Sequence, residues 1–206
     1  MSDFYERYWQ NSGAGAFPDL DIKWEKLRKY LPKEACSVLD FGCGAGLVLK
    51  KIAGEMPKDT EFSGADVSSA GIAEAKKNFP EAKLFTITDG GALPIPDSSI
   101  DFIFTSEVIE HVYDTENAVR EMARVLKPGG KMLLTTPFHG LLKNLALVLT
   151  NFDSHFSPTG PHIRFFTKKS LLGLLNKYGV KETEVDYFGR FYPFPHSIIV
   201  LGEKKQ

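Results

Sequence analysis

The 206-residue chain has few cysteines, almost no net charge and no long apolar run, and each absence excludes a class of protein. Cys36 and Cys43 are too few for a disulfide framework and predict reduced thiols in a cytoplasmic protein. A net charge of −1 gives no general reason to expect nucleic acid or an anionic membrane as a partner. The longest apolar stretch, 141–149, is too short to cross a bilayer, and the polar, aromatic N-terminus is not a signal peptide.

Two common nucleotide-binding motifs are also missing. The sequence contains no P-loop lysine motif, and a dinucleotide fingerprint that starts at Gly42 would need a third glycine at position 47, where leucine stands. Residues 37–46 read instead Ser-Val-Leu-Asp-Phe-Gly-Cys-Gly-Ala-Gly and precede an amphipathic helix over 47–53. A glycine-rich turn that leads into a helix N-terminus collects free N–H groups, which suit a carboxylate or a phosphate.

The rest of the chain alternates between apolar strands and amphipathic helices, which predicts one α/β domain with a mostly parallel sheet. The expected strands are 38–41, 61–66, 83–88, 100–105, 131–135, 180–188 and 198–202, the last two as an antiparallel pair. The expected helices are 4–9, 22–31, 47–53, 70–79, 116–126 and 167–178, and Lys-Pro-Gly-Gly at 127–130 is expected to separate a helix from a strand.

Five spaced segments between residues 31 and 179 resemble the motifs of class I S-adenosylmethionine-dependent methyltransferases. They are the glycine turn at 37–46, the acid that ends the second strand, Asp89 with its glycines, the segment 106–112, and 127–130. The resemblance implies a Rossmann-like three-layer sandwich. Its seven-stranded, mostly parallel sheet would have an antiparallel last strand and helices on both faces. It also implies the cofactor S-adenosylmethionine and the product S-adenosylhomocysteine.

The same resemblance implies which residues contact the cofactor. Asp66 would accept hydrogen bonds from the ribose, because it ends the second strand 26 residues after Asp40, near the usual interval of about 20. A helix cap is the alternative role for Asp66, and a simple turn is the alternative for Asp89. The implied contacts in the body of the chain are Asp40, Gly42, Cys43, Gly44, Asp66, Val67, Asp89, Gly90 and Ser106.

Residues 1–32 are expected to form an N-terminal helical lid. Aromatic residues recur there at helical spacing, so one face of the first helix is apolar. Tyr8 and Trp9 would be its contacts with the cofactor, although simple packing of this helix on the body is the favoured alternative.

Glu107, Glu110 and His111 stand at i, i+3 and i+4, which would place them on one face of a helical turn. The pattern resembles a divalent-metal triad of ubiquinone-type O-methyltransferases and of RNA 3′-terminal 2′-O-methyltransferases, with His162 as a fourth ligand. Such a set suits Mn²⁺ or Zn²⁺ better than Mg²⁺. The favoured alternative is that no metal binds and that these residues shape the pocket.

Among five histidines, His111 and His139 are the candidates for a catalytic base. The expected reaction is methylation of an oxygen, or less readily a nitrogen, of a small or amphipathic acceptor molecule by a monomer or homodimer. An RNA acceptor is disfavoured, because the cations Lys143, Arg164, Lys168 and Lys169 make a thin track for phosphates. A non-catalytic protein that binds the cofactor as a partner subunit is the alternative from another class.

Residues 138–166 interrupt the regular α/β pattern and are expected to form an inserted substrate cap above the carboxyl edge of the sheet. A packed surface helix followed by a solvent-exposed loop is the alternative. A helix that lies on a membrane surface is disfavoured at this level, because only Lys143 would supply its basic face.

Overall fold

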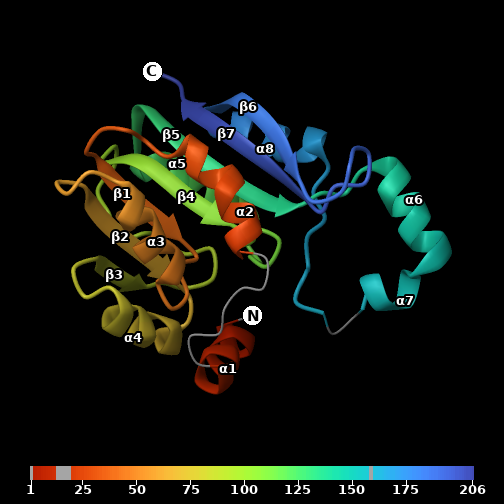
Figure 1. The fold of residues 1–206 in the computed structure, drawn as a ribbon, viewed down its shortest axis with the longest axis horizontal. Coiled ribbons are helices and arrows are strands. Elements are labelled where there is room, and N and C mark those ends of the chain that lie inside the picture. The colour runs from red at the N-terminus through yellow and green to blue at the C-terminus, as the bar shows by residue number, and fades with distance from the viewer. Residues whose placement is uncertain (1, 13–19, 158–159) are drawn as a thin grey trace.

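The apolar strands form a single seven-stranded sheet in the order β3-β2-β1-β4-β5-β7-β6 (Figure 1). A computed structural model describes residues 2–12, 20–157 and 160–206. Its strands are β1 (Ser37–Phe41), β2 (Glu61–Asp66), β3 (Lys83–Thr86), β4 (Ile100–Ser106), β5 (Leu126–Pro137), β6 (Val180–Phe188) and β7 (Ser197–Lys204). The first five strands pair in parallel, and β7 runs antiparallel to both of its neighbours, β5 and β6. The predicted Rossmann-like fold is confirmed.

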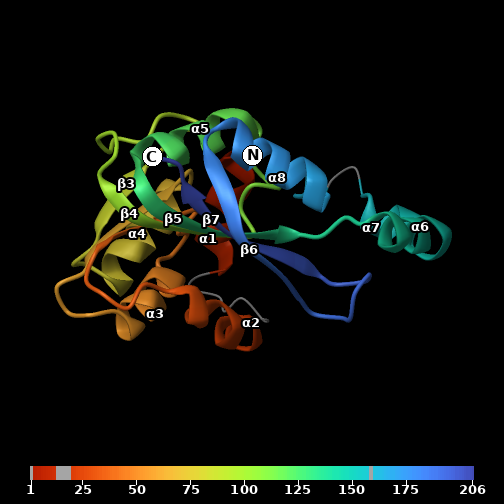
Figure 2. The same ribbon diagram turned by 90° about the horizontal axis from the view of Figure 1, so that it is seen from above.

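Helices cover both faces of the sheet, because side chains alternate between the faces along each strand (Figure 2). Val38 packs in a cluster with residues of α2 and α3, whereas its neighbour Leu39 packs in a cluster with residues of α5 and α8. The helices are α1 (Ser2–Ser12), α2 (Leu20–Leu27), α3 (Leu47–Glu55), α4 (Ser69–Asn78), α5 (Thr115–Val125), α6 (Leu141–Thr150), α7 (Phe152–His155) and α8 (Lys168–Lys177).

The helix expected over 22–31 ends earlier, at Leu27, and continues as a 3₁₀ turn over Arg28–Tyr30. The tighter turn places Leu31, which is buried, beside Trp24 and Leu27 in the same apolar cluster. Proline at position 32 excludes a further helical turn, because the residue before a proline favours an extended conformation.

The strand expected to begin at 131 begins at Leu126 instead, so the prediction that 127–130 separates helix from strand was wrong. Leu126 already pairs with Ile100, and Lys131 pairs with Phe102. Between these two pairs, the four residues 127–130 of β5 lie opposite the single residue Asp101 of β4, and the extra residues form a bulge with Gly129 at φ 77°.

Helices α6 and α7 project away from the sheet beyond the end of β5 (Figures 1 and 2). The segment that carries these helices leaves the body and returns to it at the same place, because Phe138 forms a β-bridge with Phe166 and the His139 amide donates to the Phe166 carbonyl at 2.9 Å. Two parts of the predicted lid, residue 1 and 13–19, and part of the predicted cap, 158–159, lie outside the described residues. Within the described ranges, no helix is long and apolar enough to cross a membrane.

Candidate active site

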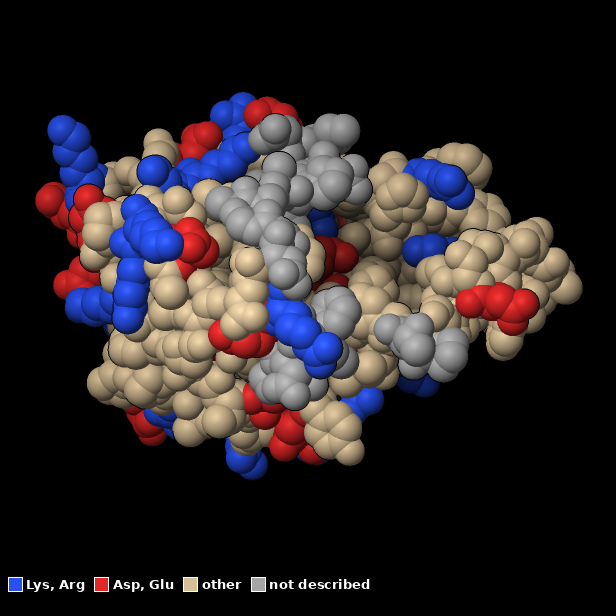
Figure 3. Space-filling view, turned by 90° about the horizontal axis from the view of Figure 1, so that it is seen from below, with Lys and Arg blue, Asp and Glu red and all other residues tan. Residues whose placement is uncertain are grey.

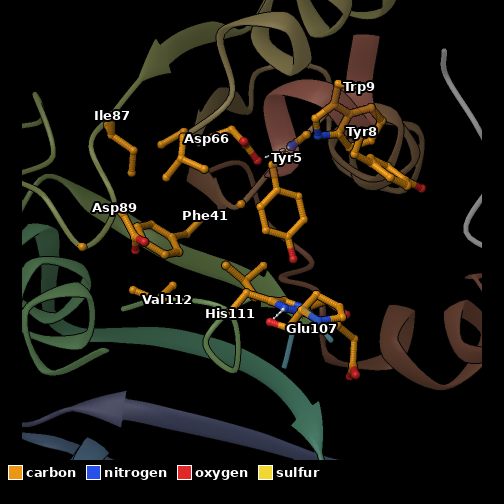
Figure 4. Close-up of a pocket in the computed structure, with 18 residues that line it drawn as sticks. Tyr5, Tyr8, Trp9, Phe41, Asp66, Ile87, Asp89, Glu107, His111 and Val112 are labelled. Carbon is orange, nitrogen blue, oxygen red and sulfur yellow. Dashed lines mark hydrogen bonds between the residues drawn. The ribbon is translucent and has the colours of Figure 1, made fainter. Parts of the chain in front are cut away.

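A cavity of about 380 Å³ opens at the carboxyl ends of β1, β2 and β4 (Figure 4). Nine of the predicted cofactor contacts line it: Tyr8, Trp9, Gly42, Gly44, Asp66, Val67, Asp89, Gly90 and Ser106. Glu107 and His111 line it as well. The remaining wall, which the sequence did not single out, consists of Tyr5, Phe41, Ala65, Ile87, Val108, Val112 and Pro161. Tyr5 had a signal in the sequence, because it stands three and four residues before Tyr8 and Trp9.

The glycine loop is packed so tightly that side chains cannot replace its glycines. Gly42 and Gly44 adopt φ +84° and +48°, and a Cβ on either would lie 2.3 Å from Val108 or Trp9, respectively. Asp66 fixes the same loop, because its Oδ2 accepts from the Gly44 amide at 2.8 Å and its Oδ1 accepts from the Ser68 amide at 2.9 Å. Burial raises the pKa of Asp66. The acid that would face a ribose also orders the loop.

Asp40 lies in β1 just before the loop and Cys43 lies within the loop, and neither lines the cavity. Both are buried, and Asp40 Oδ2 has no hydrogen-bond partner in the described part of the chain. Burial, and secondarily the nearby Asp66, raises the pKa of Asp40 to about 8. The structure therefore places these two residues as supports of the loop, and their predicted contact with a cofactor stays a prediction.

Helix α1 forms one wall of the cavity and is anchored to the start of α4. The carboxylate of Glu6 accepts from the hydroxyls of Ser68 and Ser69 at 2.8 and 2.9 Å and from the Ala70 amide at 3.2 Å. Trp9 is buried and lies against two glycines, Gly44 of the loop and Gly71 of α4. This placement is consistent with the predicted lid.

Asp89 lies at the opposite wall of the cavity from α1 (Figure 4). Its Oδ1 accepts from the Tyr113 amide at 3.0 Å, which ties the segment after β3 to the segment after β4. The apolar residues Ile87 and Val112 line the cavity beside it. An apolar slot with one carboxylate at its edge suits a flat heteroaromatic ring that carries an amino group.

Glu107 does not share a helical face with Glu110 and His111, so that prediction was wrong. It has φ +56° directly after β4, and a left-handed residue interrupts a helix. Its carboxylate accepts from Lys23 Nζ at 2.5 Å and from the Thr135 hydroxyl at 2.8 Å. This ion pair with α2 draws the Glu107 side chain away from the other two residues.

His111 lines the cavity, and its Nε2 lies 3.7 Å from Glu110 Oε1. Its Nδ1 lies 2.9 Å from the Pro161 carbonyl oxygen. A carbonyl can only accept, so Nδ1 carries the proton and Nε2 keeps its lone pair. Burial lowers the pKa of His111, which favours the neutral ring. Tyr5 packs edge-on against the imidazole, with the ring centres 5.5 Å apart.

Three of the four predicted metal ligands converge. Ligand atoms of Glu110, His111 and His162 lie within 4.8 Å of one another, and Glu107 is not part of this group. Glu110 Oε2 accepts from the Thr136 hydroxyl at 3.0 Å, whereas Oε1 is buried, has no hydrogen-bond partner among the described residues and lies 3.7 Å from His111 Nε2. Burial, and secondarily Glu107, raises the pKa of Glu110 to about 8. One carboxylate and two imidazoles fit Zn²⁺ or Mn²⁺.

His139 lies outside the cavity. It is buried near the base of the projecting helices, where its Nδ1 is 3.0 Å from Asn144 Oδ1 and its ring packs against His155 and Phe165. Burial lowers the pKa of His139 to about 4. His111 and His139 are therefore not brought together, and only His111 faces the cavity.

Comparison with known proteins gives a consistent assignment. Residues 39–134 match the family described as "Methyltransferase domain". The chain is 30% identical over 86% of its length to the biotin biosynthesis bifunctional protein BioHC of Cellvibrio japonicus. It is 31% identical over 73% of its length to the ubiquinone biosynthesis O-methyltransferase of Cereibacter sphaeroides. It spans 36% and 62% of these two relatives, less than two thirds of either.

The fold is also shared with solved structures. A SAM dependent methyltransferase from Aquifex aeolicus superposes with a TM-score of 0.70 at 17% identity, with 98% of each chain covered. The glycine loop, the acid at the end of β2 and the cavity lie at the carboxyl ends of parallel strands, the edge at which open α/β sheets bind ligands. The chain belongs to the class I S-adenosylmethionine-dependent methyltransferases.

Proposed function

We propose that the protein transfers a methyl group from S-adenosylmethionine to a hydroxyl oxygen of a small-molecule acceptor, with His111 as the general base. The observation that carries the proposal is the hydrogen bond between His111 Nδ1 and the Pro161 carbonyl, which leaves Nε2 unprotonated at the cavity. A hydroxyl becomes a good nucleophile as its proton leaves, so a neutral imidazole at this wall is suited to the reaction.

The cavity residues fit the cofactor. Gly42 and Gly44 line the cavity beside the buried carboxylate of Asp66, and backbone amides next to a carboxylate suit a ligand with hydroxyl groups and a charged end. The volume of about 380 Å³ lies within the usual range of about 300–1,000 Å³ for a small-molecule site. S-adenosylmethionine supplies a methyl group already activated on a sulfonium, so the protein has mainly to position the acceptor and remove its proton.

The acceptor would approach along the return loop, 160–166. Pro161 is the cavity-lining residue that the predicted cap contributes, and the amides of Ile163 and Arg164 fix the loop by donating to the Glu110 carbonyl. The ubiquinone relative is named as an O-methyltransferase, which supports oxygen over nitrogen. A role for α6 and α7 as the rest of a cap stays a proposal, because their residues line none of this cavity.

A metal-dependent reaction is the second candidate, and the buried Oε1 of Glu110 favours it, because this oxygen has no hydrogen-bond partner among the described residues. Glu110, His111 and His162 would hold the ion, which would draw the acceptor oxygen toward them and lower its pKa. The RNA 3′-terminal 2′-O-methyltransferase reading depends on this ion. If the protein were instead a non-catalytic partner subunit, it would bind S-adenosylmethionine without converting it to S-adenosylhomocysteine.

The test compares His111→Gln with His139→Gln, a matched change at a buried histidine outside the cavity. With a panel of phenols, alcohols and amines and methyl-labelled cofactor, we expect His111→Gln to lower kcat by about 10²–10⁴-fold, because the base is lost, with the KM for the cofactor little changed. His139→Gln should retain kcat if it folds.

Chelation separates the two roles of His111. Activity that survives a chelator, with no metal found by elemental analysis of the protein, supports the base. Activity that is lost and returns with Mn²⁺ or Zn²⁺ would make His111 a ligand. Full activity of His111→Gln, or preferred transfer to amines, would contradict the proposal.

A further inference from the structure

Helix α6 presents its apolar face to solvent. Leu141, Leu145 and Val148 follow one another at helical spacing, and Leu142 and Leu149 flank them. At 100° per residue these side chains, continued by Phe152 at the start of α7, fill a stripe about 120° wide. All six are exposed, Leu141 by 84% and Leu149 by 76%. A surface helix of a globular protein normally turns such a stripe inward, so this orientation requires an explanation.

Lys143 fixes the rotation of the helix. Its ammonium group lies on the side opposite the stripe and donates to the backbone carbonyls of Phe138 and Pro195, both at 2.8 Å. The helix therefore holds its one cation, which is partly buried, against the body and turns its leucines outward. Because these hydrogen bonds would break if the helix rotated, the exposed stripe is a built feature of the fold.

A second element adds large apolar side chains to the same end of the molecule. Lys143 joins α6 to the loop between β6 and β7, and that loop carries Phe191 and Tyr192, exposed by 76% and 68%. Aromatic side chains of this kind favour the boundary between water and hydrocarbon. The stripe and the loop define one surface, which we call the apolar end.

The charges around the apolar end are almost all positive. Within 138–178 and 189–196, Asp153 is the only acidic residue. The cations in these ranges include Arg164, Lys168 and Lys169 before and at the start of α8 and Arg190 in the β6–β7 loop, in a chain with 25 basic and 26 acidic residues. Lys177, at the other end of α8, pairs with Glu116. Figure 3 shows the projecting end as mostly uncharged with few acidic side chains. This pattern disfavours a second copy of the chain, since two such ends would repel each other, and it complements an anionic surface.

We propose that the apolar end docks on an anionic lipid bilayer, with the α6 stripe and Phe152 inserted to the boundary between headgroups and acyl chains. Amphipathic helices bind in this way when leucines and aromatic residues face the acyl chains and cations face the headgroups. The sequence argued against this mode because α6 itself carries only Lys143. In the folded chain the cations come instead from the start of α8 and from the β6–β7 loop. The inference does not depend on the reaction at the cavity.

The test is flotation of the full chain with vesicles of phosphatidylcholine, with and without about one third phosphatidylglycerol. We expect binding to the anionic vesicles that weakens with salt. The double variant L145E/L149E should lower the bound fraction by about tenfold or more, because two leucines leave the stripe. Thr150→Glu, on another side of the same exposed helix, adds a negative charge without removing apolar area and should bind more strongly than the double variant.

A charge control separates lipid attraction from net charge. The pairs K168E/K169E and K58E/K76E change the net charge equally, but Lys58 and Lys76 lie away from the apolar end, after α3 and on α4. Only the first pair should lose vesicle binding. Equal loss in both pairs, no vesicle binding by the native chain, or a stripe-dependent dimer in sedimentation that excludes lipid would overturn the proposal. Unchanged S-adenosylhomocysteine binding in each variant confirms that the body is folded.

Discussion

The buried carboxyl of a single residue, Asp40, lowers the stability of the folded chain as pH rises. Its carboxyl is buried at the end of β1, and one oxygen has no partner among the described residues. Its pKa rises from 3.8 in the unfolded chain to about 8 in the folded one, chiefly through burial. Between these values the folded state binds one proton more than the unfolded state, so this residue's contribution to stability falls as pH rises.

We therefore expect Asp40→Asn to change the pH dependence of unfolding. The free energy of unfolding of the native chain, relative to the variant, should fall by about 1 kcal/mol per pH unit as pH rises toward 8, and level off above it. Urea unfolding of both proteins at several pH values measures the difference. Asp59→Asn, an exposed control, should leave the profile unchanged. Parallel curves for the native chain and Asp40→Asn would show that Asp40 is ionised in the folded state.

Helix α1 shows how one element completes the site. It meets the body through the Glu6 carboxylate at the start of α4 and through Trp9 against the glycine loop. A negative charge at a helix N-terminus is stabilising, so Glu6 selects this docking position. The position of Trp9 requires glycine at Gly44, because a Cβ on Gly44 would collide with the indole.

Trp9→Ala should weaken S-adenosylhomocysteine binding by about 1–2 kcal/mol, because the wall loses a large apolar side chain. Calorimetry measures the affinity, and hydrogen exchange of the α1 amides should become faster in the variant. Gln10→Ala, on an exposed position of the same helix, is the matched control. Equal affinities in the native chain and in Trp9→Ala would mean that α1 packs on the body without closing the site.

At the scale of the whole molecule, the body and the projecting helices are nearly independent. The described residues of α6 and α7 include no buried side chain, and the segment leaves and returns at the Phe138–Phe166 bridge. The two apolar clusters that hold the sheet draw on α2, α3, α5 and α8 instead.

Replacement of residues 141–157 by a short Gly-Ser linker should leave the thermal midpoint and S-adenosylhomocysteine affinity close to native. Leu171→Ala, in the buried face of α8, should by contrast cost about 2–5 kcal/mol. Calorimetry and thermal unfolding decide both outcomes. Methyl transfer lost with cofactor binding retained would support the substrate cap; a large fall in the midpoint would contradict the independence of the two parts.

The α/β layering and the glycine loop could be predicted from the sequence alone. Both follow from local patterns, because strand alternation fixes which face a side chain takes and a left-handed backbone requires glycine at Gly42 and Gly44. The spacing of the aromatic residues also predicted an apolar face on the first helix, and Tyr5, Tyr8 and Trp9 of that helix line the cavity.

The hydrogen-bond and ion-pair partners of the polar residues in the site could not be predicted, because they depend on the tertiary structure. Lys23 forms an ion pair with Glu107, which lies 84 positions further along the chain. The Pro161 carbonyl, 50 positions after His111, accepts a hydrogen bond from His111 Nδ1 and so determines which ring nitrogen carries the proton. The direction in which α6 faces depends in the same way on Lys143 reaching carbonyls of another loop. A sequence pattern fixes the spacing of side chains along one element, but the partner of a buried charge is chosen by contacts that form when distant elements pack.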